Sequence, residues 1–127
     1  MRILIIGAGN TGKYLTAKLC EMGQDVVVID PDTQAINDLN MNFDVMTIKG
    51  NGADPELLTT SNIGKIDLLA AVTPHDEINL LACCWGKAAG TNYTISRLSQ
   101  HKYINSPLVD FKTLGVDRAL IQREECT

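Results

Sequence analysis

The glycines of the segment IIGAGNTGKYL, residues 5–15, are the residues with the clearest chemical role. Gly7, Gly9 and Gly12 have the spacing G-x-G-x-x-G, which is typical of a turn that binds the diphosphate of a dinucleotide. Gly7, Gly12 and Lys13 also fit G-x-x-x-x-G-K, most of the P-loop that binds nucleoside triphosphates. Both patterns place main-chain amides around a phosphate, so the neighbouring residues must distinguish them.

The residues around the turn do not support a P-loop. A P-loop needs Ser or Thr directly after its lysine to hold Mg²⁺, and here that position is Tyr14. We find no convincing second carboxylate for the metal. Asp67 begins a predicted strand rather than ending one, so we expect it at the wrong edge of the sheet.

The dinucleotide turn makes more demands, and the sequence meets them. We expect Gly7 to permit the tight turn, Gly9 to let phosphates approach the main chain, and Gly12 to let the helix pack close to the strand. The amides of residues 9–12 would then face an anion at the positive end of a helix. Asp30 ends the next predicted strand, eighteen residues beyond Gly12, where its carboxylate can accept hydrogen bonds from both ribose hydroxyls of an adenosine. Because it would repel a 2′-phosphate, NADP is disfavoured. A glycine turn without a ligand, with Asp30 merely solvated, stays open as the alternative.

No combination of residues predicts a reaction. Tyr14 and Lys18 form Y-x-x-x-K, the catalytic pair of short-chain dehydrogenases, but they lie on the helix of the phosphate turn instead of well after it. His75 precedes Asp76 and Glu77, and this HDE segment lacks the second histidine of the zinc motif H-E-x-x-H. A hydride-transfer enzyme also needs groups that hold a substrate against the nicotinamide, and almost no residues remain for them once the sheet is built. We interpret the chain as a binding module that responds by changing shape.

Short apolar runs alternate with segments of helical periodicity along the chain. The predicted strands are residues 2–7, 25–30, 44–50, 67–73, 93–98 and 117–122. The predicted helices are residues 11–22, 33–41, 54–60 and 74–90, with one short helix before Pro107 and another after it. This alternation predicts an α/β fold, a Rossmann-like doubly wound parallel sheet of about six strands with helices on both faces. The ligand of such a sheet lies at the carboxyl ends of the strands.

Composition and charge exclude several classes of protein. The net charge of −4 disfavours a nucleic-acid partner, which requires a basic surface. No apolar run reaches the roughly eighteen residues of a membrane-spanning helix, so we expect a soluble, cytoplasmic chain with no direct membrane insertion. The cysteines lack metal-ligand spacing, and we expect reduced, mostly packed thiols and no metal; they are Cys20, Cys83, Cys84 and Cys126.

The chain resembles one family over about residues 1–122. This is the nucleotide-binding lobe of the regulator-of-potassium-conductance domains, also called RCK, KTN or TrkA-N domains, and most of all that of the peripheral subunits of Trk-type potassium uptake systems. The resemblance rests on IIGAGNTG (5–12), VVVIDPD (26–32), IKGNGADPELL (48–58), LLAAVTPHDEINLLAC (68–83), ISR (95–97) and LGVDRAL (114–120). Ordinary dehydrogenases do not combine GNGADPE with AVTPHDEIN, so this pair is more specific than the glycine turn.

The resemblance implies roles for individual residues. The turn from Gly7 through Ala8 and Gly9 to Gly12 would hold the phosphates, with Asn10 and Thr11 closest to them. Asp30 would bind the adenosine ribose. The rest of the site would be Asn51, Gly52 and Ala53 beside the adenine, Thr73 and Pro74 near the phosphates or the distal ribose, and Arg97 near a phosphate or a neighbouring subunit. Glu77 and Asn79 would either shape the site or cap the helix.

The resemblance also implies a function. The chain would be a cytoplasmic nucleotide-sensing regulatory subunit, peripheral to the inner face of the cell membrane, that controls a membrane-embedded potassium transporter or channel by ligand-dependent conformational change. Members of the family assemble as homodimers or higher homo-oligomers. The helix at 75–89, with Trp85, is a candidate subunit interface, or its apolar stripe packs on the sheet. NAD or NADH is the expected ligand, with ATP/ADP or AMP as alternatives, because Asp30 suits any adenosine with free ribose hydroxyls.

Two other functions stay open at this point. One is the cofactor lobe of an NAD-dependent oxidoreductase, and the other is a nucleotide-binding regulator of another cation antiporter. We expect residues 1–127 to form a single nucleotide-binding domain, without the second regulatory lobe that members of this family usually carry after the last strand.

Overall fold

The computed structural model describes residues 1–60 and 63–122. In chain order its elements are β1 (Arg2–Ile6), α1 (Asn10–Glu21), β2 (Asp25–Asp30), α2 (Thr33–Asn42), β3 (Met46–Lys49), α3 (Glu56–Thr60), β4 (Leu68–Ala71), α4 (Asp76–Ala88), β5 (Tyr93–Leu98), α5 (His101–Ile104) and β6 (Arg118–Ile121). All six predicted strands are confirmed, with ends that differ from the prediction by two residues at most.

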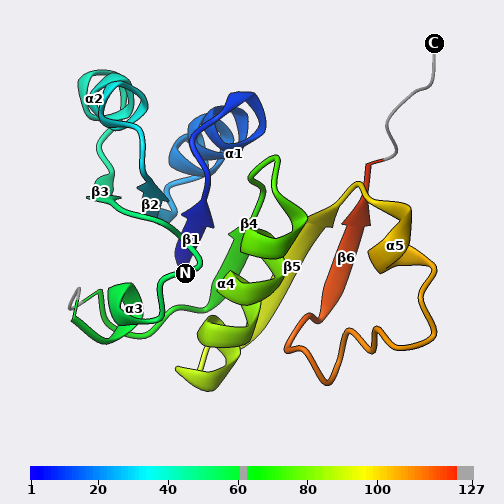
Figure 1. The fold of residues 1–127 in the computed structure, drawn as a ribbon. Coiled ribbons are helices and arrows are strands. Elements are labelled where there is room, and N and C mark those ends of the chain that lie inside the picture. Colours follow the sequence, from blue (N-terminus) through cyan, green and yellow to red (C-terminus); the bar gives the residue numbers. More distant parts are fainter. Residues whose placement is uncertain (61–62, 123–127) are drawn as a thin grey trace, which may run out of the picture.

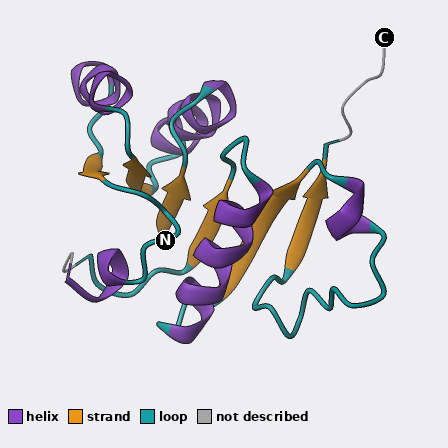
Figure 2. Ribbon diagram, in the orientation of Figure 1, coloured by secondary structure: helices purple, strands orange, loops and turns teal. Residues whose placement is uncertain are grey.

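The strands form one parallel sheet in the order β3-β2-β1-β4-β5-β6. The order reverses between β1 and β4, which are neighbours in the sheet but far apart in sequence (Figure 1). Helices α1 and α2 cover one face, and α3 and α4 cover the other (Figure 2). The predicted doubly wound Rossmann-like architecture is therefore confirmed.

Strand β1 lies at the centre of the core. Ile3 and Ile5 pack toward α1 and α2, while Leu4 and Ile6 pack toward α3 and α4. None of these four side chains is more than 2% exposed. Full burial of one such side chain contributes about 1.5–3 kcal/mol, so the strand's apolar sequence accounts for its central position.

Polar residues and glycines set the ends of the helices. Asp32 caps α2 by accepting a hydrogen bond from the Gln34 amide at 3.0 Å. Asp54 accepts from the Glu56 amide at 3.0 Å at the start of α3, as a capping side chain does. Gly23 and Gly90 follow α1 and α4 with φ of 76° and 98°, a conformation that side chains rarely adopt. These two glycines end the helices and let the chain turn toward the next strand.

The prediction of a second short helix after Pro107 is wrong. Before this proline the structure has α5, and after it residues 108–117 form isolated turns. The Val116 amide bonds to Phe111 O at 2.8 Å, and Gly115 has a φ of 83°. Burial of Phe111 and Val116 against the core bends the chain back toward β6, so these residues cannot continue as a helix.

Candidate functional site

The glycine turn between β1 and α1 is packed too closely for side chains at two of its positions. Gly7 has a φ of 110°, and a Cβ atom there would lie 3.1–3.3 Å from three atoms of Thr73. A Cβ atom on Gly12 would lie 1.8 Å from Gly7 O. These contacts bear out the predicted tight turn and close approach of the helix. A Cβ atom on Gly9 would meet nothing within 4 Å, so Gly9 faces open space.

The amino end of α1 offers main-chain N–H groups without a competing side chain. Its N-cap residue is Gly9, no side chain caps the helix, and its first turn contains no acidic residue. In α2, by contrast, the Asp32 carboxylate already accepts a hydrogen bond from the Gln34 amide. The free N–H groups and the helix dipole make the start of α1 suitable for an anion. Asn10 and Thr11 are both exposed there.

Asp30 ends β2 beside this turn. Its Oδ2 accepts a hydrogen bond from the Ala8 amide at 2.7 Å, and its Oδ1 accepts from the Asp32 amide at 2.8 Å. A carboxylate can accept about four hydrogen bonds, so both oxygens keep capacity for further donors. The two amides fix the orientation of a group that is suited to a pair of ribose hydroxyls.

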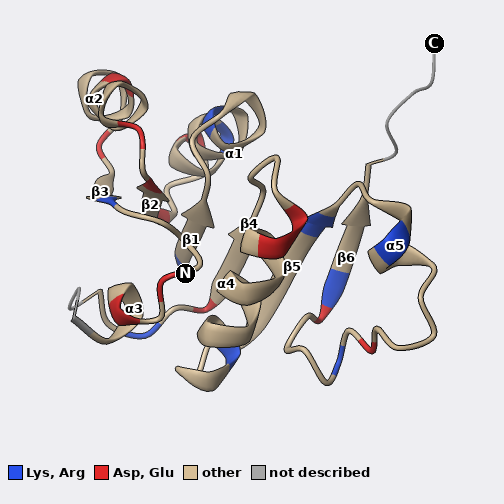
Figure 3. Cartoon of the chain, viewed as in Figure 1, with Lys and Arg blue, Asp and Glu red and all other residues tan. Residues whose placement is uncertain are grey.

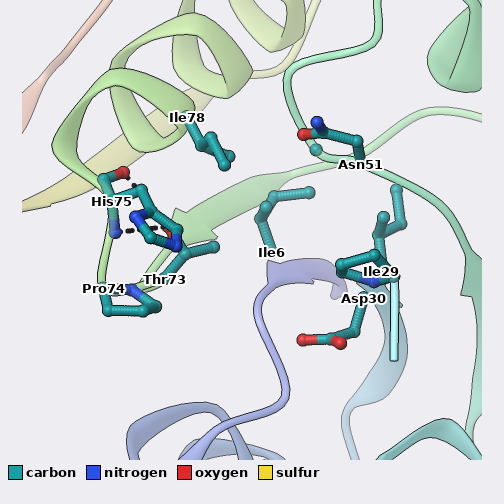
Figure 4. Close-up of a pocket in the computed structure, with 10 residues that line it drawn as sticks. Ile6, Ile29, Asp30, Asn51, Thr73, Pro74, His75 and Ile78 are labelled. Atoms are coloured by element: carbon teal, nitrogen blue, oxygen red, sulfur yellow. Dashed lines mark hydrogen bonds between the residues drawn. The ribbon is translucent and has the colours of Figure 1, made fainter. Parts of the chain in front are cut away.

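A cavity of about 230 Å³ opens beside Asp30. We call it the ribose-side cavity; its lining is Ile6, Ile29, Asp30, Pro31, Asn51, Gly52, Thr73, Pro74, His75 and Ile78. Figure 4 shows Asp30 and Asn51 on one side, Thr73, Pro74 and His75 on the other, and Ile6 between them. The walls are mostly apolar with a few polar groups, which is typical of sites for small molecules.

The loop after β3 contributes two of its three predicted adenine neighbours to this cavity. Gly52 packs so closely that a Cβ atom would lie 2.2 Å from Ile6 Cγ2. Asn51 folds the loop by accepting a hydrogen bond from the Ala53 amide at 2.9 Å. Ala53 itself is not part of the lining, and its carbonyl accepts a hydrogen bond from Trp85 Nε1 at 2.8 Å. Ala53 therefore joins the loop to α4.

A second cavity, of about 330 Å³, lies at the amino end of α1. We call it the phosphate-side cavity; its lining is Gly9, Asn10, Thr11, Val72, Pro74, Arg97 and Gln122. Pro74 borders both cavities, which together follow the carboxyl edge of the sheet from β2 to β6. Figure 3 shows a basic stretch near the end of β5 beside the acidic start of α4. Arg97 lies near the end of β5 and forms no ion pair within residues 1–60 and 63–122.

The first turn of α4 connects the site to the segment after β5. Asp76 is 1% exposed and accepts hydrogen bonds from the amides of Ser99 and Gln100, at distances from 2.7 to 3.1 Å. Glu77 is exposed and accepts from Gln100 Nε2 and Tyr103 Oη. A hydrogen bond from its own main-chain amide is the largest cause of a lowered Glu77 pKa, and the bonds from Tyr103 and Gln100 add to it. The sequence did not predict that Asp76 binds the Ser99 and Gln100 amides. An acidic residue in the first turn of a helix does not indicate which distant groups it will contact.

Asn79 and His75 also lie in this region. Asn79 is fully buried and bonds to Thr73 and to the Arg97 carbonyl, so its partners are residues that line the two cavities and not the free amides of α4. His75 is exposed and borders the ribose-side cavity.

The other chemically suggestive residues lie away from both cavities. Tyr14 is 63% exposed on α1, and Lys18 pairs with Glu21. Asp67 accepts a hydrogen bond from the Arg2 amide at the opposite edge of the sheet, where no P-loop carboxylate could act.

The thiols do not form a reactive or metal-binding centre in the described part of the chain. Cys20, Cys83 and Cys84 are free, and burial raises the pKa of Cys83 to about 12. Cys126 lies outside the described residues. Within residues 1–60 and 63–122, no group of three or more His, Cys, Asp or Glu side chains could hold a metal ion. No helix of these same ranges is long and apolar enough to cross a membrane.

Sequence comparison relates the whole described fold to one family. The sequence model of the TrkA-N domain matches residues 3–122. The chain is 40% identical to Trk system potassium uptake protein trkA homolog 1 of Methanosarcina mazei, over 92% of this chain and 30% of that protein. It is 34% identical to the corresponding homolog of Archaeoglobus fulgidus, over 92% of this chain and 26% of that protein. The chain thus spans less than a third of the length of these relatives.

Structural comparison finds the same fold in distant proteins. The TrkA-N domain of the inner membrane protein ybaL from Escherichia coli superposes with a TM-score of 0.79 at 18% identity, covering 94% of this chain and 86% of that one. The GsuK channel bound to NAD superposes with a TM-score of 0.76 at 17% identity, covering 94% of this chain and 21% of that one. With the family match over residues 3–122, these results lead to one conclusion: the chain belongs to the TrkA-N domain family.

Proposed function

We propose that this chain is the nucleotide-sensing domain of a regulator of potassium transport. Its relatives from Methanosarcina mazei and Archaeoglobus fulgidus are named as Trk potassium uptake proteins, and a channel with the same fold has been solved with NAD bound. The partner would be a membrane-embedded potassium transporter or channel subunit. The domain would act from the cytoplasmic side of the membrane, as a homodimer or a larger homo-oligomer.

The ligand would be NAD or NADH, with ATP/ADP or AMP as related candidates. One observation carries this proposal: the Ala8 amide, within the glycine turn, holds the Asp30 carboxylate at the mouth of the ribose-side cavity. Adenosine would occupy this cavity with its ribose on Asp30. The phosphates would lie in the phosphate-side cavity, between the N–H groups of α1 and the guanidinium of Arg97. Asp30 would repel a 2′-phosphate, so NADP would bind weakly.

The domain would act by changing conformation rather than by catalysis. A ligand shifts a conformational equilibrium only to the extent that it binds the two states with different affinity, and a coupling of ~1–3 kcal/mol is typical of such regulators. The oxidoreductase alternative would require groups that hold a second substrate. In the described chain, Asp30 and His75 line one cavity and Arg97 lines the other, and Asp30 would bind the ribose.

Calorimetric titration of the purified chain with NAD, NADH, ATP, ADP, AMP and NADP tests the binding proposal. We expect saturable binding of the ligands with free ribose hydroxyls and a clearly weaker response to NADP. An Asp30→Ala variant, checked for folding by circular dichroism, serves as the control and should lose most of the affinity. Equal affinity for NAD and NADP would contradict the proposed role of Asp30.

Potassium uptake in the source cell tests the regulatory proposal. Deletion of the gene should impair growth or rubidium uptake at limiting potassium, and the full-length wild-type protein should restore it. The full-length protein with Asp30→Ala should restore it poorly at equal expression. Uptake that is unaffected by deletion would exclude this transport role, and turnover of a hydride donor by the purified chain would favour the oxidoreductase instead.

A further inference from the structure

Asn79 is a buried polar residue with an unusually complete set of partners. It lies on α4 and is 0% exposed. Its Oδ1 accepts hydrogen bonds from Thr73 N at 3.0 Å and Thr73 Oγ1 at 2.7 Å. Its Nδ2 donates to Thr73 O and to Arg97 O, both at 3.0 Å. The two donors and two acceptor positions of the amide are thus all used.

These partners belong to different parts of the proposed site. Thr73 lines the ribose-side cavity, and the adjoining Pro74 borders both cavities. Arg97 lines the phosphate-side cavity. A single side chain therefore connects the wall between the cavities to the end of β5. Within residues 1–60 and 63–122, no other side chain forms hydrogen bonds to both Thr73 and Arg97.

The arrangement differs from that of a helix cap. A capping side chain bonds to free amides of its own helix, whereas all four bonds of Asn79 leave α4 for the preceding turn and for β5. Burial of an amide costs free energy unless every polar atom is bonded, and removal of one partner leaves the others unpaired. Helix stability alone does not explain an asparagine at this position.

We propose that Asn79 is a positioning residue that sets the spacing between the ribose-side and phosphate-side cavities. A dinucleotide that enters both cavities depends on that spacing, whereas a nucleoside in the ribose-side cavity alone depends on it much less. Asn79 thereby makes the site selective for long ligands over short ones. This inference rests on the proposed function, because it assumes that the two cavities hold one nucleotide.

The test compares NAD with adenosine in the wild-type chain and in Asn79→Ser. Serine removes the connection but leaves room for water to satisfy the carbonyl groups. We expect the affinity for NAD to fall about tenfold, as for the loss of a hydrogen bond in a charged site. The affinity for adenosine should change by less than about twofold. Equal losses for both ligands, or no loss for NAD, would overturn the inference.

Cys83→Ala provides a matched control on the same helix. Cys83 is buried, and its Sγ donates to the β5 carbonyl of Ile95 at 3.4 Å, one turn farther from the site. This variant should alter stability without changing the ratio of NAD to adenosine affinity. A double variant with Arg97→Ala adds a second readout. If Asn79 acts through the end of β5, Asn79→Ser should have a smaller effect on NAD affinity in the Arg97→Ala background, and an undiminished effect would contradict that route.

A measurement on the wild-type chain covers the case in which Asn79→Ser fails to fold. The side-chain amide signals of Asn79 in a ¹⁵N NMR spectrum should shift with NAD and remain nearly unchanged with adenosine. If NAD binds but the chemical shifts of these signals do not change, the inference is overturned while the proposed function is left intact. A wild-type chain that binds none of NAD, adenosine, ATP, ADP and AMP would instead refute the proposed function and this inference with it.

Discussion

The main-chain amide of Ala8 lies 2.7 Å from Asp30 Oδ2 and donates a hydrogen bond to it. These residues are twenty-two positions apart: Ala8 lies in the turn after β1, and Asp30 ends the neighbouring strand β2. The bond fixes the carboxylate that we propose for ribose relative to the turn that we propose for phosphates, before any ligand binds. Such preorganisation lowers the entropy that binding must overcome.

Asp30→Ala should weaken NAD binding roughly tenfold to a hundredfold, since hydrogen bonds to a charged acceptor contribute about 1.5–3 kcal/mol. It should weaken NADP binding much less, because the repulsion of the 2′-phosphate disappears together with the acceptor. Titration calorimetry of both ligands on both proteins measures the change in selectivity. A constant ratio of NAD to NADP affinity would show that Asp30 does not discriminate between them.

Gly9 and Gly12 offer a pair of alanine variants that separates binding from folding. Gly12→Ala forces a Cβ atom to within 1.8 Å of Gly7 O, so the main chain must move, and we expect a loss of about 1–3 kcal/mol or more in the free energy of unfolding. Gly9→Ala adds a Cβ atom in open space, at a φ of −74° that suits any residue, and should change stability by less than about 0.5 kcal/mol.

Nucleotide binding should nevertheless weaken in Gly9→Ala, because the added methyl group would stand where phosphates approach the turn. Urea unfolding and NAD titration of both variants provide the measurements. A stable Gly9→Ala chain with wild-type affinity would show that the phosphates do not contact this turn.

Trp85 should report occupancy of the ribose-side cavity. It is the single tryptophan of the sequence, and its Nε1 bonds to Ala53 O, next to Gly52 in the cavity lining. We expect its fluorescence, excited at a wavelength that NAD does not absorb, to change in a saturable way with NAD. Trp85→Phe keeps a ring but loses the N–H donor, and calorimetry should show an affinity lower by about fivefold. The fluorescence of Asp30→Ala should stay constant at the same NAD concentrations, and an equal change there would indicate a nonspecific signal.

The ion pair between Lys87 and Asp117 should add to stability above acidic pH. Asp117 also accepts a hydrogen bond from the Thr94 amide at 2.8 Å, and the bond from Lys87 is the main cause of its lowered pKa. A carboxyl group whose pKa is lower in the folded chain stabilises it above the ordinary value of 3.8, and this contribution is lost as the pH falls through the lower, folded value.

Asp117→Asn should therefore lower the free energy of unfolding by about 1 kcal/mol at pH 7, a modest loss because the pair is partly exposed. The loss should become progressively smaller below pH 4, because Asp117 is then protonated in the wild-type chain as well. Thermal unfolding from pH 2 to pH 7 measures the difference between the two proteins. A difference that does not change with pH would assign the effect of Asp117 to packing or neutral hydrogen bonding.

Much of the fold could be predicted because the sheet is buried on both faces. Ile3 to Ile6 must all be apolar in such a strand, and the helices must follow each strand with regular spacing. The positions of Gly7, Gly12 and Asp30 were also predictable, because they depend on a short stretch of sequence. The two glycines belong to one strand–turn–helix unit, and Asp30 ends the strand that follows it. Their contacts in the structure agree with that geometry.

The polar connections of α4 could not be predicted in this way. Asp76 bonds to Ser99 and Gln100 across more than twenty residues, and Asn79 reaches Arg97 across eighteen. Periodicity describes which face of a helix is apolar but not which distant amide meets a buried polar group. The turns after Pro107 escaped prediction because burial of Val116, and not local preference, bends that segment.

The reversal of strand order between β1 and β4 has a consequence for a ligand that spans it. The two halves of the sheet are joined along that seam, and the two cavities open above it, one toward β2 and one toward β5. A molecule that lay across the seam would touch both halves of the sheet at once. Two nucleotides that share an adenosine would make the same contacts on the β2 side and would differ only in those on the β5 side.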